Sequence, residues 1–212
     1  MTDTPRSIAV TGTGSAEAAP DLLTLSIGVE CRRAGVDDAY RDAGRAAAAI
    51  TGALRDHRVP DRDIGTTGLS VRAEVGWQEG LGQIVSGYLA TSMLRVRLRD
   101  LAGSAAILSD AVAAGGDDAR LQGIELGFAD PADVEAQARE AAWDDARTRA
   151  EHFAALAGAR LGRVSSVTQQ PASAAGVPPP PLQRTAAAAP LVVEAGSTSV
   201  TAAVGVVWEL LD

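Results

Sequence analysis

The sequence contains no lysine, a single cysteine, two histidines and only 3% aromatic residues. One cysteine cannot form an intrachain disulfide, so no disulfide framework holds this fold together. All 19 basic residues are arginine, and 27 acidic residues outnumber them to give a formal net charge of −8. Because binding to a phosphate backbone needs a cationic surface, we expect no nucleic-acid partner.

The few reactive side chains do not form a catalytic pattern. Cys31, His57 and His152 are too few and too far apart for a zinc quartet, and no Gly-X-Ser-X-Gly motif occurs. Cys31 falls on the apolar side of its strand, where a thiol is a small inert hydrophobe; the alternative is a redox-sensing thiol. We therefore predict no catalytic, cofactor-binding or metal-binding residues, no cofactor and no enzymatic activity.

The N-terminal residues and the lengths of the apolar runs indicate the cellular location of the protein. The first six residues lead to a strand without an apolar signal core, and no apolar run reaches transmembrane length. We expect a cytoplasmic protein without a transmembrane segment, exported only if this N-terminus is incomplete.

Hydrophobic residues make up 46% of the chain, and many are alanine. Thin alanine-rich cores gain stability by association, so self-association is expected.

Alternating and helical periodicities predict ten elements in the order β-β-α-β-β-α-β-α-β-β. Strands are expected over residues 7–14, 23–32, 69–77, 88–98, 124–128 and 200–210, with a return strand between Gly158 and Thr168. Helices are expected over residues 36–57 and 130–157, and a further helix is expected to follow Asp100 and to end at Gly115-Gly116. A longish loop around residues 79–82 is expected to join the third and fourth strands. Hairpins mixed with helical crossovers favour an α+β fold, with mixed or antiparallel sheets and helices packed on one face.

The long helix is the most clearly marked element. Asp130-Pro131 predicts its start, and Gly158 predicts its end because glycine accepts the left-handed conformation at C′. Three- and four-residue spacing predicts one buried face, formed by Val134, Ala138, Ala142, Ala146, Ala150, Phe153 and Ala157. Asp145 and Arg149 stand four residues apart in the order that favours an ion pair, and Asp144 and Arg147 stand three apart.

We expect one domain over residues 1–212, interrupted by a Pro/Ala-rich loop over residues 171–190. Four successive prolines, Pro178 to Pro181, cannot join a regular element and favour an extended, exposed segment. This loop is interpreted as a spacer; the alternative is a ligand for a proline-recognising module.

Two short motifs suggest binding sites. Gly12-Thr13-Gly14 lacks the third glycine and the following helix of a dinucleotide-binding loop, so a strand bend or tight connection is the preferred interpretation. Arg95, Arg97 and Arg99 alternate along one strand and form a ridge on one face. This ridge is interpreted as an exposed face paired with carboxylates such as Glu30, Glu125 or Glu209, or as a site for an anion or an acidic partner.

The stretch Ala142 to Ala150, with Leu156-Ala157-Gly158 and Leu161-Gly162-Arg163-Val164, resembles the signature of the bacterial SIMPL-domain family, also called DUF541. The signature residues here are Asp145, Ala146, Arg147, Arg149, Gly158 and Gly162, with Arg149 at a position where the family commonly has lysine. The resemblance extends over nearly the whole chain. It implies an α+β protein that forms homo-oligomers, with a loose link to oxidative or other stress and no established catalytic residues.

Three functions are compatible with these observations. The preferred hypothesis is a non-enzymatic, self-assembling protein with a stress-related role. The alternative is a module that binds a small ligand or a protein partner through the arginine-lined sheet face. A hydrolase or redox enzyme is the least supported hypothesis, because no catalytic constellation accompanies it.

Overall fold

The computed structural model describes residues 6–80, 82–170 and 194–212. Within these residues the contacts group into two compact units, where one domain was expected from the sequence. We call residues 6–19, 130–170 and 196–212 the terminal unit, and residues 20–80, 82–129 and 194–195 the central unit. That the two units fold as a single domain stays a prediction. The predicted Pro/Ala-rich loop over residues 171–190 lies outside the described residues.

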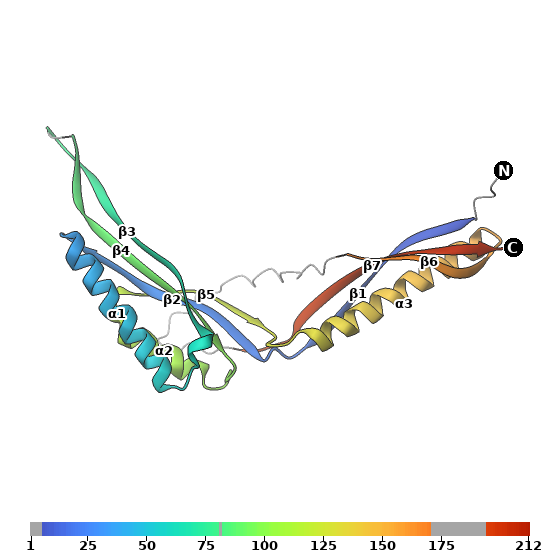
Figure 1. The fold of residues 1–212 in the computed structure, drawn as a ribbon, viewed down its shortest axis with the longest axis horizontal. Coiled ribbons are helices and arrows are strands. Elements are labelled where there is room, and N and C mark those ends of the chain that lie inside the picture. The colour runs from blue at the N-terminus through green and yellow to red at the C-terminus, as the bar shows by residue number, and fades with distance from the viewer. Residues whose placement is uncertain (1–5, 81, 171–193) are drawn as a thin grey trace. The chain divides into compact units, whose positions relative to one another are not determined.

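The terminal unit is a three-stranded antiparallel sheet with one long helix on it. The strand order is β1-β7-β6, formed by β1 (Ser7–Ala18), β7 (Thr198–Leu211) and β6 (Arg160–Gln170). Helix α3 (Ala132–Leu156) runs along the sheet (Figure 1). Strand β7 lies between the other two, so the C-terminal segment is the centre of this sheet.

The central unit is a four-stranded antiparallel sheet in the order β3-β4-β2-β5. Its strands are β2 (Leu22–Arg33), β3 (Ile64–Gln78), β4 (Gly82–Leu98) and β5 (Ala119–Gly127). Helices α1 (Val36–Asp56) and α2 (Ser104–Gly115) cover one face of the sheet, as Figure 1 shows. Single 3-10 turns, Asp61–Asp63 and Gly116–Asp118, precede β3 and β5.

The predicted element order and the α+β class are confirmed, with the helices on one face of each sheet. The third and fourth strands are longer than predicted. Strand β3 starts at Ile64, and β3 and β4 continue to Gln78 and Gly82, so the predicted longish loop between them is a short turn. The turn is short because pairing with β4 continues along β3 as far as Gln78.

The core of the central unit is built on β2, whose alternate side chains face α1 and α2. Leu23, Leu25, Ile27, Val29 and Cys31 are all buried. Burial raises the pKa of the Cys31 thiol to about 11, and a hydrogen bond with Asp118 acts in the same direction. Such a thiol is protonated at neutral pH, which agrees with its interpretation as an inert core residue.

Helix α3 packs on the terminal sheet through a stripe of small side chains. Its buried residues are Val134, Ala138, Ala142, Ala146, Ala150 and Ala154. The prediction of Phe153 in this stripe is wrong, because its side chain is 51% exposed and Ala154 takes the buried position. Ala157 is also exposed. A strict four-residue repeat of alanine lets the helix lie close to the strands, where a larger side chain would not fit.

Gly12 and Gly14 make this close approach possible. A Cβ atom on Gly12 would lie 2.1 Å from the Ala142 carbonyl oxygen, and one on Gly14 would lie 2.2 Å from the Ala142 amide nitrogen. The strand bend predicted at Gly12-Thr13-Gly14 does not occur, because β1 runs through these residues to Ala18. The two glycines instead let the strand backbone touch the helix backbone.

The ends of α3 follow local sequence signals. Pro131 occupies the N-cap position rather than the first helical position, and the Asp130 carboxylate accepts a hydrogen bond from the Ala132 amide at 3.0 Å. Gly158 has a φ of +66°, as predicted for the residue that ends the helix. In the described parts of the chain, no helix combines the length and apolar character needed to cross a membrane.

We predict that Gly12→Ala destabilises the protein strongly, because the added methyl group has no space between β1 and α3. Overpacking of this kind typically costs about 1 to 3 kcal/mol. The free energy of unfolding in urea measures the effect. Gly44→Ala in α1 is the control, since Gly44 is exposed and no atom lies within 4 Å of the position that an added Cβ would occupy. That control should be stabilising by up to about 1 kcal/mol, and equal stability of Gly12→Ala and the wild type would contradict the packing described here.

Candidate functional site

The face of the central sheet opposite α1 and α2 carries a pocket of about 620 Å³. Thr24 and Ser26 of β2 form its floor, since they alternate with the buried leucines that face the helices. All four strands and the turn before β3 contribute to its lining, which comprises Thr24, Leu25, Ser26, Arg62, Asp63, Gly65, Thr66, Thr67, Arg95, Arg97, Gly123 and Glu125.

A β-bulge lies on each side of this pocket. On β3, Thr66 pairs with Leu94 and Gly68 with Met93, so Thr67 is an extra residue. On β5, Gly123 is the extra residue in the pairing with β2, and its φ of +61° favours glycine. Bulges bend a strand and redirect its side chains, and they are common beside functional sites. The two edge strands therefore curve at the positions that border the pocket.

A buried carboxylate, Asp63, lies at one end of the pocket. Its side chain is fully buried, Arg99 Nη1 donates a hydrogen bond to Oδ2, and Arg97 Nη2 lies 3.0 Å from Oδ1. The Arg97 contact does not have hydrogen-bond geometry, so Oδ1 is a buried oxygen with an ion-pair neighbour but no donor among the described residues. Asp63 is not among the carboxylates predicted above as partners of the arginines. Its position in the turn just before β3 is the signal that could have pointed to it.

The structure divides the predicted ridge of three arginines into two roles. Arg97 and Arg99 hold Asp63, and Arg97 also donates to the Arg62 carbonyl oxygen at 3.3 Å. Arg95 is exposed in the pocket and makes no ion pair or hydrogen bond within the described residues. Arg95 is therefore a cation of this pocket that has no ion-pair or hydrogen-bond partner among the described residues.

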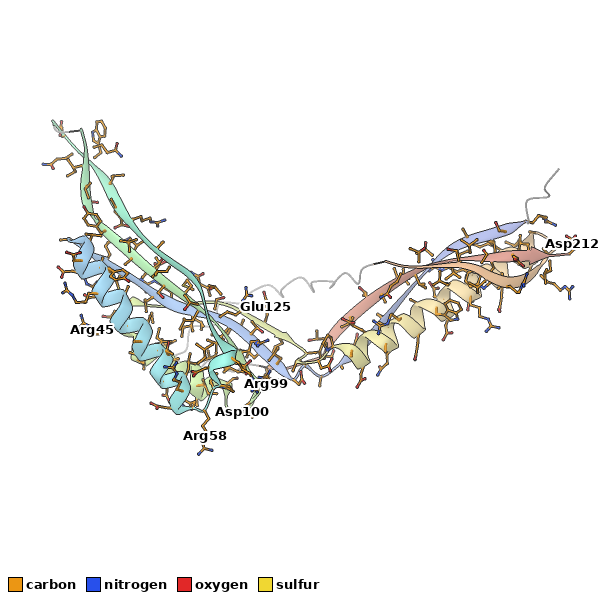
Figure 2. The ribbon with its side chains drawn as sticks, in the orientation of Figure 1. Arg45, Arg58, Arg99, Asp100, Glu125 and Asp212 are labelled. Atoms are coloured by element: carbon orange, nitrogen blue, oxygen red, sulfur yellow. The ribbon has the colours of Figure 1, made fainter. Side chains whose placement is uncertain are left out.

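None of the three predicted carboxylate partners forms an ion pair with the arginine ridge in the described residues. Glu30 pairs with Arg120 at 3.2 Å, and Glu209 belongs to the terminal unit, where it lies 3.4 Å from Arg163. Glu125 lines the same pocket as Arg95 and comes from β5 (Figure 2). In the part of the chain that the structure describes, its carboxylate has no ion pair or hydrogen bond. The prediction of cross-strand pairing with these three residues is therefore wrong.

We predict that Arg99→Ala destabilises the protein more than Asp63→Ala does. Removing Arg99 takes away the hydrogen-bond donor of a buried carboxylate and leaves it only the ion-pair contacts with Arg97 at 3.0 Å and Arg62 at 4.0 Å, which should cost about 3 kcal/mol. Removing Asp63 leaves arginines that are 46% exposed and can be hydrated, so the cost should be about 1 to 2 kcal/mol. Urea unfolding measures both.

The control for this comparison is Arg55→Ala, which breaks an exposed ion pair with Asp61. Exposed pairs contribute less than about 1 kcal/mol. If Asp63→Ala proved the more harmful of the two pocket variants, the carboxylate would not be the group whose burial needs compensation.

The residues that resemble a family signature lie on the terminal unit, where they bind an edge strand. The Thr13 amide donates to Asp145 Oδ2 at 2.8 Å, and Arg149 Nε donates to Asp145 Oδ1 at 3.0 Å. Arg149 Nη1 also donates to the Thr11 carbonyl oxygen at 3.2 Å. The predicted Asp145–Arg149 pair is therefore present, and it satisfies backbone groups on the outer edge of β1.

The other signature residues have structural positions. Ala146 is buried where β1 approaches α3, Gly158 ends α3, and a Cβ on Gly162 would lie 2.9 Å from the Glu209 carbonyl oxygen of β7. Arg147 pairs with Glu151 at 2.8 Å rather than with Asp144 as predicted, since the four-residue spacing brings their side chains together.

Asp145 makes the stability of the terminal unit dependent on pH. The hydrogen bond from the Thr13 amide lowers the pKa of Asp145, and Arg149 adds to this effect. A carboxyl group with a lowered pKa in the folded state stabilises the fold above its unfolded pKa of about 3.9. That stabilisation is lost as the pH falls through the lowered pKa.

We predict that Asp145→Asn is less stable than the wild type at pH 7 and that this difference disappears as the pH falls below about 3.9. The variant cannot carry the charge that Thr13 and Arg149 favour. Urea unfolding at a series of pH values measures the difference. Asp144→Asn is the control, because the Asp144 side chain is exposed and makes no described hydrogen bond or ion pair. A difference between Asp145→Asn and the wild type that did not change with pH would rule out this ionic contribution.

An exposed apolar stripe runs along β3, the edge strand of the central sheet. Four of its side chains on one face are exposed: Leu69 (61%), Val71 (38%), Val75 (57%) and Trp77 (81%). In Figure 1 the β3–β4 hairpin continues beyond the end of α1, so the helix does not cover its far half. Strand β3 pairs only with β4 in this sheet, which leaves the backbone groups of its outer edge unpaired by any described strand.

Comparison with known proteins identifies the class of protein. The family model described as SIMPL, a protein of unknown function (DUF541), matches residues 8–208, and the chain belongs to this family. It is 28% identical to the 26 kDa periplasmic immunogenic protein of Brucella melitensis biotype 1, over 99% of this chain and 87% of that protein. It is 31% identical to the uncharacterized protein YggE of Escherichia coli K12, over 76% of this chain and 64% of that protein.

These comparisons confirm the resemblance to the SIMPL family and contradict the expected cellular location. The cytoplasmic location predicted from the sequence is contradicted, since the Brucella relative, which matches nearly the whole chain, is named as a periplasmic protein.

Proposed function

We propose that this chain is a periplasmic, non-catalytic SIMPL-family protein whose function depends on self-association through the edge of its central sheet. The name of the Brucella relative supports the location. The exposed apolar stripe on β3 is the observation that carries the proposal of self-association. A stress-related role, which the family resemblance implies, stays a prediction.

An exposed edge strand with an apolar face is a favourable surface for pairing with another strand. Its unpaired N–H and C=O groups form a template for strand addition, and natural proteins usually block such edges with charges, bulges or covering elements. Strand β3 spans Ile64–Gln78, which makes it long for an edge strand, and its exposed apolar side chains follow one another at every second or fourth position. Covering this stripe would remove a substantial apolar area from water.

The sequence of β3 complements itself in one antiparallel register. If two copies pair about Ala73, Leu69 of one copy lies opposite Trp77 of the other, and Val71 lies opposite Val75. The same register places Arg72 opposite Glu74. Glu74 already binds Arg32 of its own chain, with Arg32 Nη2 donating to Oε1 at 2.8 Å, so Arg72 of a second copy would extend an existing charge network. A two-fold symmetric interface requires this kind of self-complementarity.

We predict that Ala73→Cys forms a disulfide-linked dimer under mild oxidation, because residues opposite each other in an antiparallel pair have Cβ atoms about 4.5 to 5.5 Å apart. The native Cys31 is buried and should not react. Ser70→Cys is the matched control on the same strand, since in this register it faces Gly76 rather than its own symmetry mate. Non-reducing gels measure both.

Light scattering during size-exclusion chromatography tests the association itself. The wild type should form a defined oligomer, and Val75→Glu should shift it towards the monomer. A monomeric wild type at all concentrations would overturn self-association. An oligomer in which Ala73→Cys does not cross-link would retain self-association and reject only the β3 register.

The pocket on the open face of the central sheet supports a second function, the binding of a small charged molecule. The observation that supports ligand binding does not involve the β3 edge. Arg95 and Glu125 line one pocket, and neither has an ion-pair or hydrogen-bond partner among the described residues. Pockets of about 300 to 1,000 Å³ are the usual size for small ligands, and this one falls within that range.

A further inference from the structure

We propose that the pocket binds a small zwitterion, with its carboxylate on Arg95 and its ammonium group on Glu125. This proposal rests on the second function above and adds the chemical class of the ligand. It does not depend on self-association, because the pocket is lined by residues from one copy of the central unit.

The charges of the pocket leave one cation and one anion available. Arg97 is held by Asp63, and Arg62 lies 4.0 Å from the same carboxylate, so neither is as free as Arg95 to bind a ligand. Glu125 would repel a simple anion that approached Arg95, and Arg95 would repel a simple cation that approached Glu125. A ligand that carries both charges satisfies both groups, and charge-assisted hydrogen bonds to carboxylates are among the stronger polar contacts.

The sheet register keeps Arg95 and Glu125 apart. Arg95 of β4 pairs with Ser26 of β2, whereas Glu125 of β5 pairs with Thr24, the next residue of β2 on the same face. Their backbones are therefore separated by two strand spacings, about 10 Å, and are offset by two residues along the sheet, about 7 Å. A molecule whose ammonium and carboxylate groups stand several bonds apart, as in a dipeptide, suits this separation.

The floor of the pocket between Arg95 and Glu125 is polar, and its hydroxyl groups are available for hydrogen bonds with a ligand. Thr24 and Ser26 are half-buried, and neither hydroxyl has a hydrogen-bond partner among the described residues. Each can donate or accept, which suits the amide of a short peptide. The bulge residue beside Glu125 is Gly123, which has no side chain to fill that part of the pocket wall. The pocket thus offers a cation, hydroxyl groups and an anion in sequence across three strands.

Equilibrium dialysis of the full chain against labelled diglycine tests the proposal, because this probe carries the two charges and no side chain. The matched probes are N-acetyl-diglycine, which lacks the ammonium group, glycylglycinamide, which lacks the carboxylate, and inorganic phosphate. We expect diglycine to bind at least about tenfold more tightly than each of the others, since each lost charge-assisted hydrogen bond weakens binding by that order.

Two isosteric variants assign each end of the probe to a residue. Glu125→Gln should weaken diglycine binding about tenfold and should no longer distinguish diglycine from N-acetyl-diglycine. Arg95→Gln should weaken it similarly and should no longer distinguish diglycine from glycylglycinamide. The controls are Arg58→Gln, just after α1 (Figure 2), and Glu140→Gln in the terminal unit, which should bind as the wild type does.

The outcomes separate the ligand class from the binding function. If phosphate binds more tightly than diglycine and Arg95→Gln abolishes its binding, the pocket is an anion site, so the zwitterion is rejected and small-ligand binding stands. If all probes bind equally to the wild type and to Arg95→Gln, the contacts are non-specific and the proposal fails. If no probe binds to the wild type, the zwitterion proposal is overturned, and small-ligand binding at this pocket loses its support.

Discussion

Among the described residues, helices cover one face of each sheet, and the rest of the described structure follows from that constraint. In the central unit, α1 and α2 cover the apolar side of β2, so the polar side that carries Thr24 and Ser26 stays open. Strands β3 and β5 are the edges of this sheet, and neither pairs with a further strand in the part of the chain that the structure describes. A single helical layer therefore leaves two kinds of surface free for binding: a sheet face and a sheet edge.

The terminal unit shows how helix side chains can protect the edge of a sheet. Gly12 allows β1 to touch α3, and this contact brings Asp145 and Arg149 to the backbone of the strand. The family signature on α3 therefore has a structural explanation, since its charged residues satisfy backbone groups that a further strand would otherwise bind. Among the described residues no comparable device covers β3, where the charges of Arg72 and Glu74 alternate with exposed apolar residues.

The two proposed functions use the two surfaces that the helices leave free, and they are physically independent. The edge of β3 offers backbone hydrogen bonds and apolar area, which suits another strand. The open face offers Arg95, Glu125 and hydroxyl groups around a pocket, which suits a small polar molecule. A protein that both assembles and carries a ligand site on each copy would use both surfaces.

The sequence by itself determined the order of the elements, the α+β class and the limits of α3, because hydrophobic period and the glycine at Gly158 act over a few residues. It also identified the face of β4 on which the arginines lie. Only the tertiary structure decided which strands are edges, that Phe153 is exposed, and that Asp63 is the buried partner of Arg97 and Arg99. These features depend on which segments far apart in the chain meet, and local periodicity carries no information about that choice.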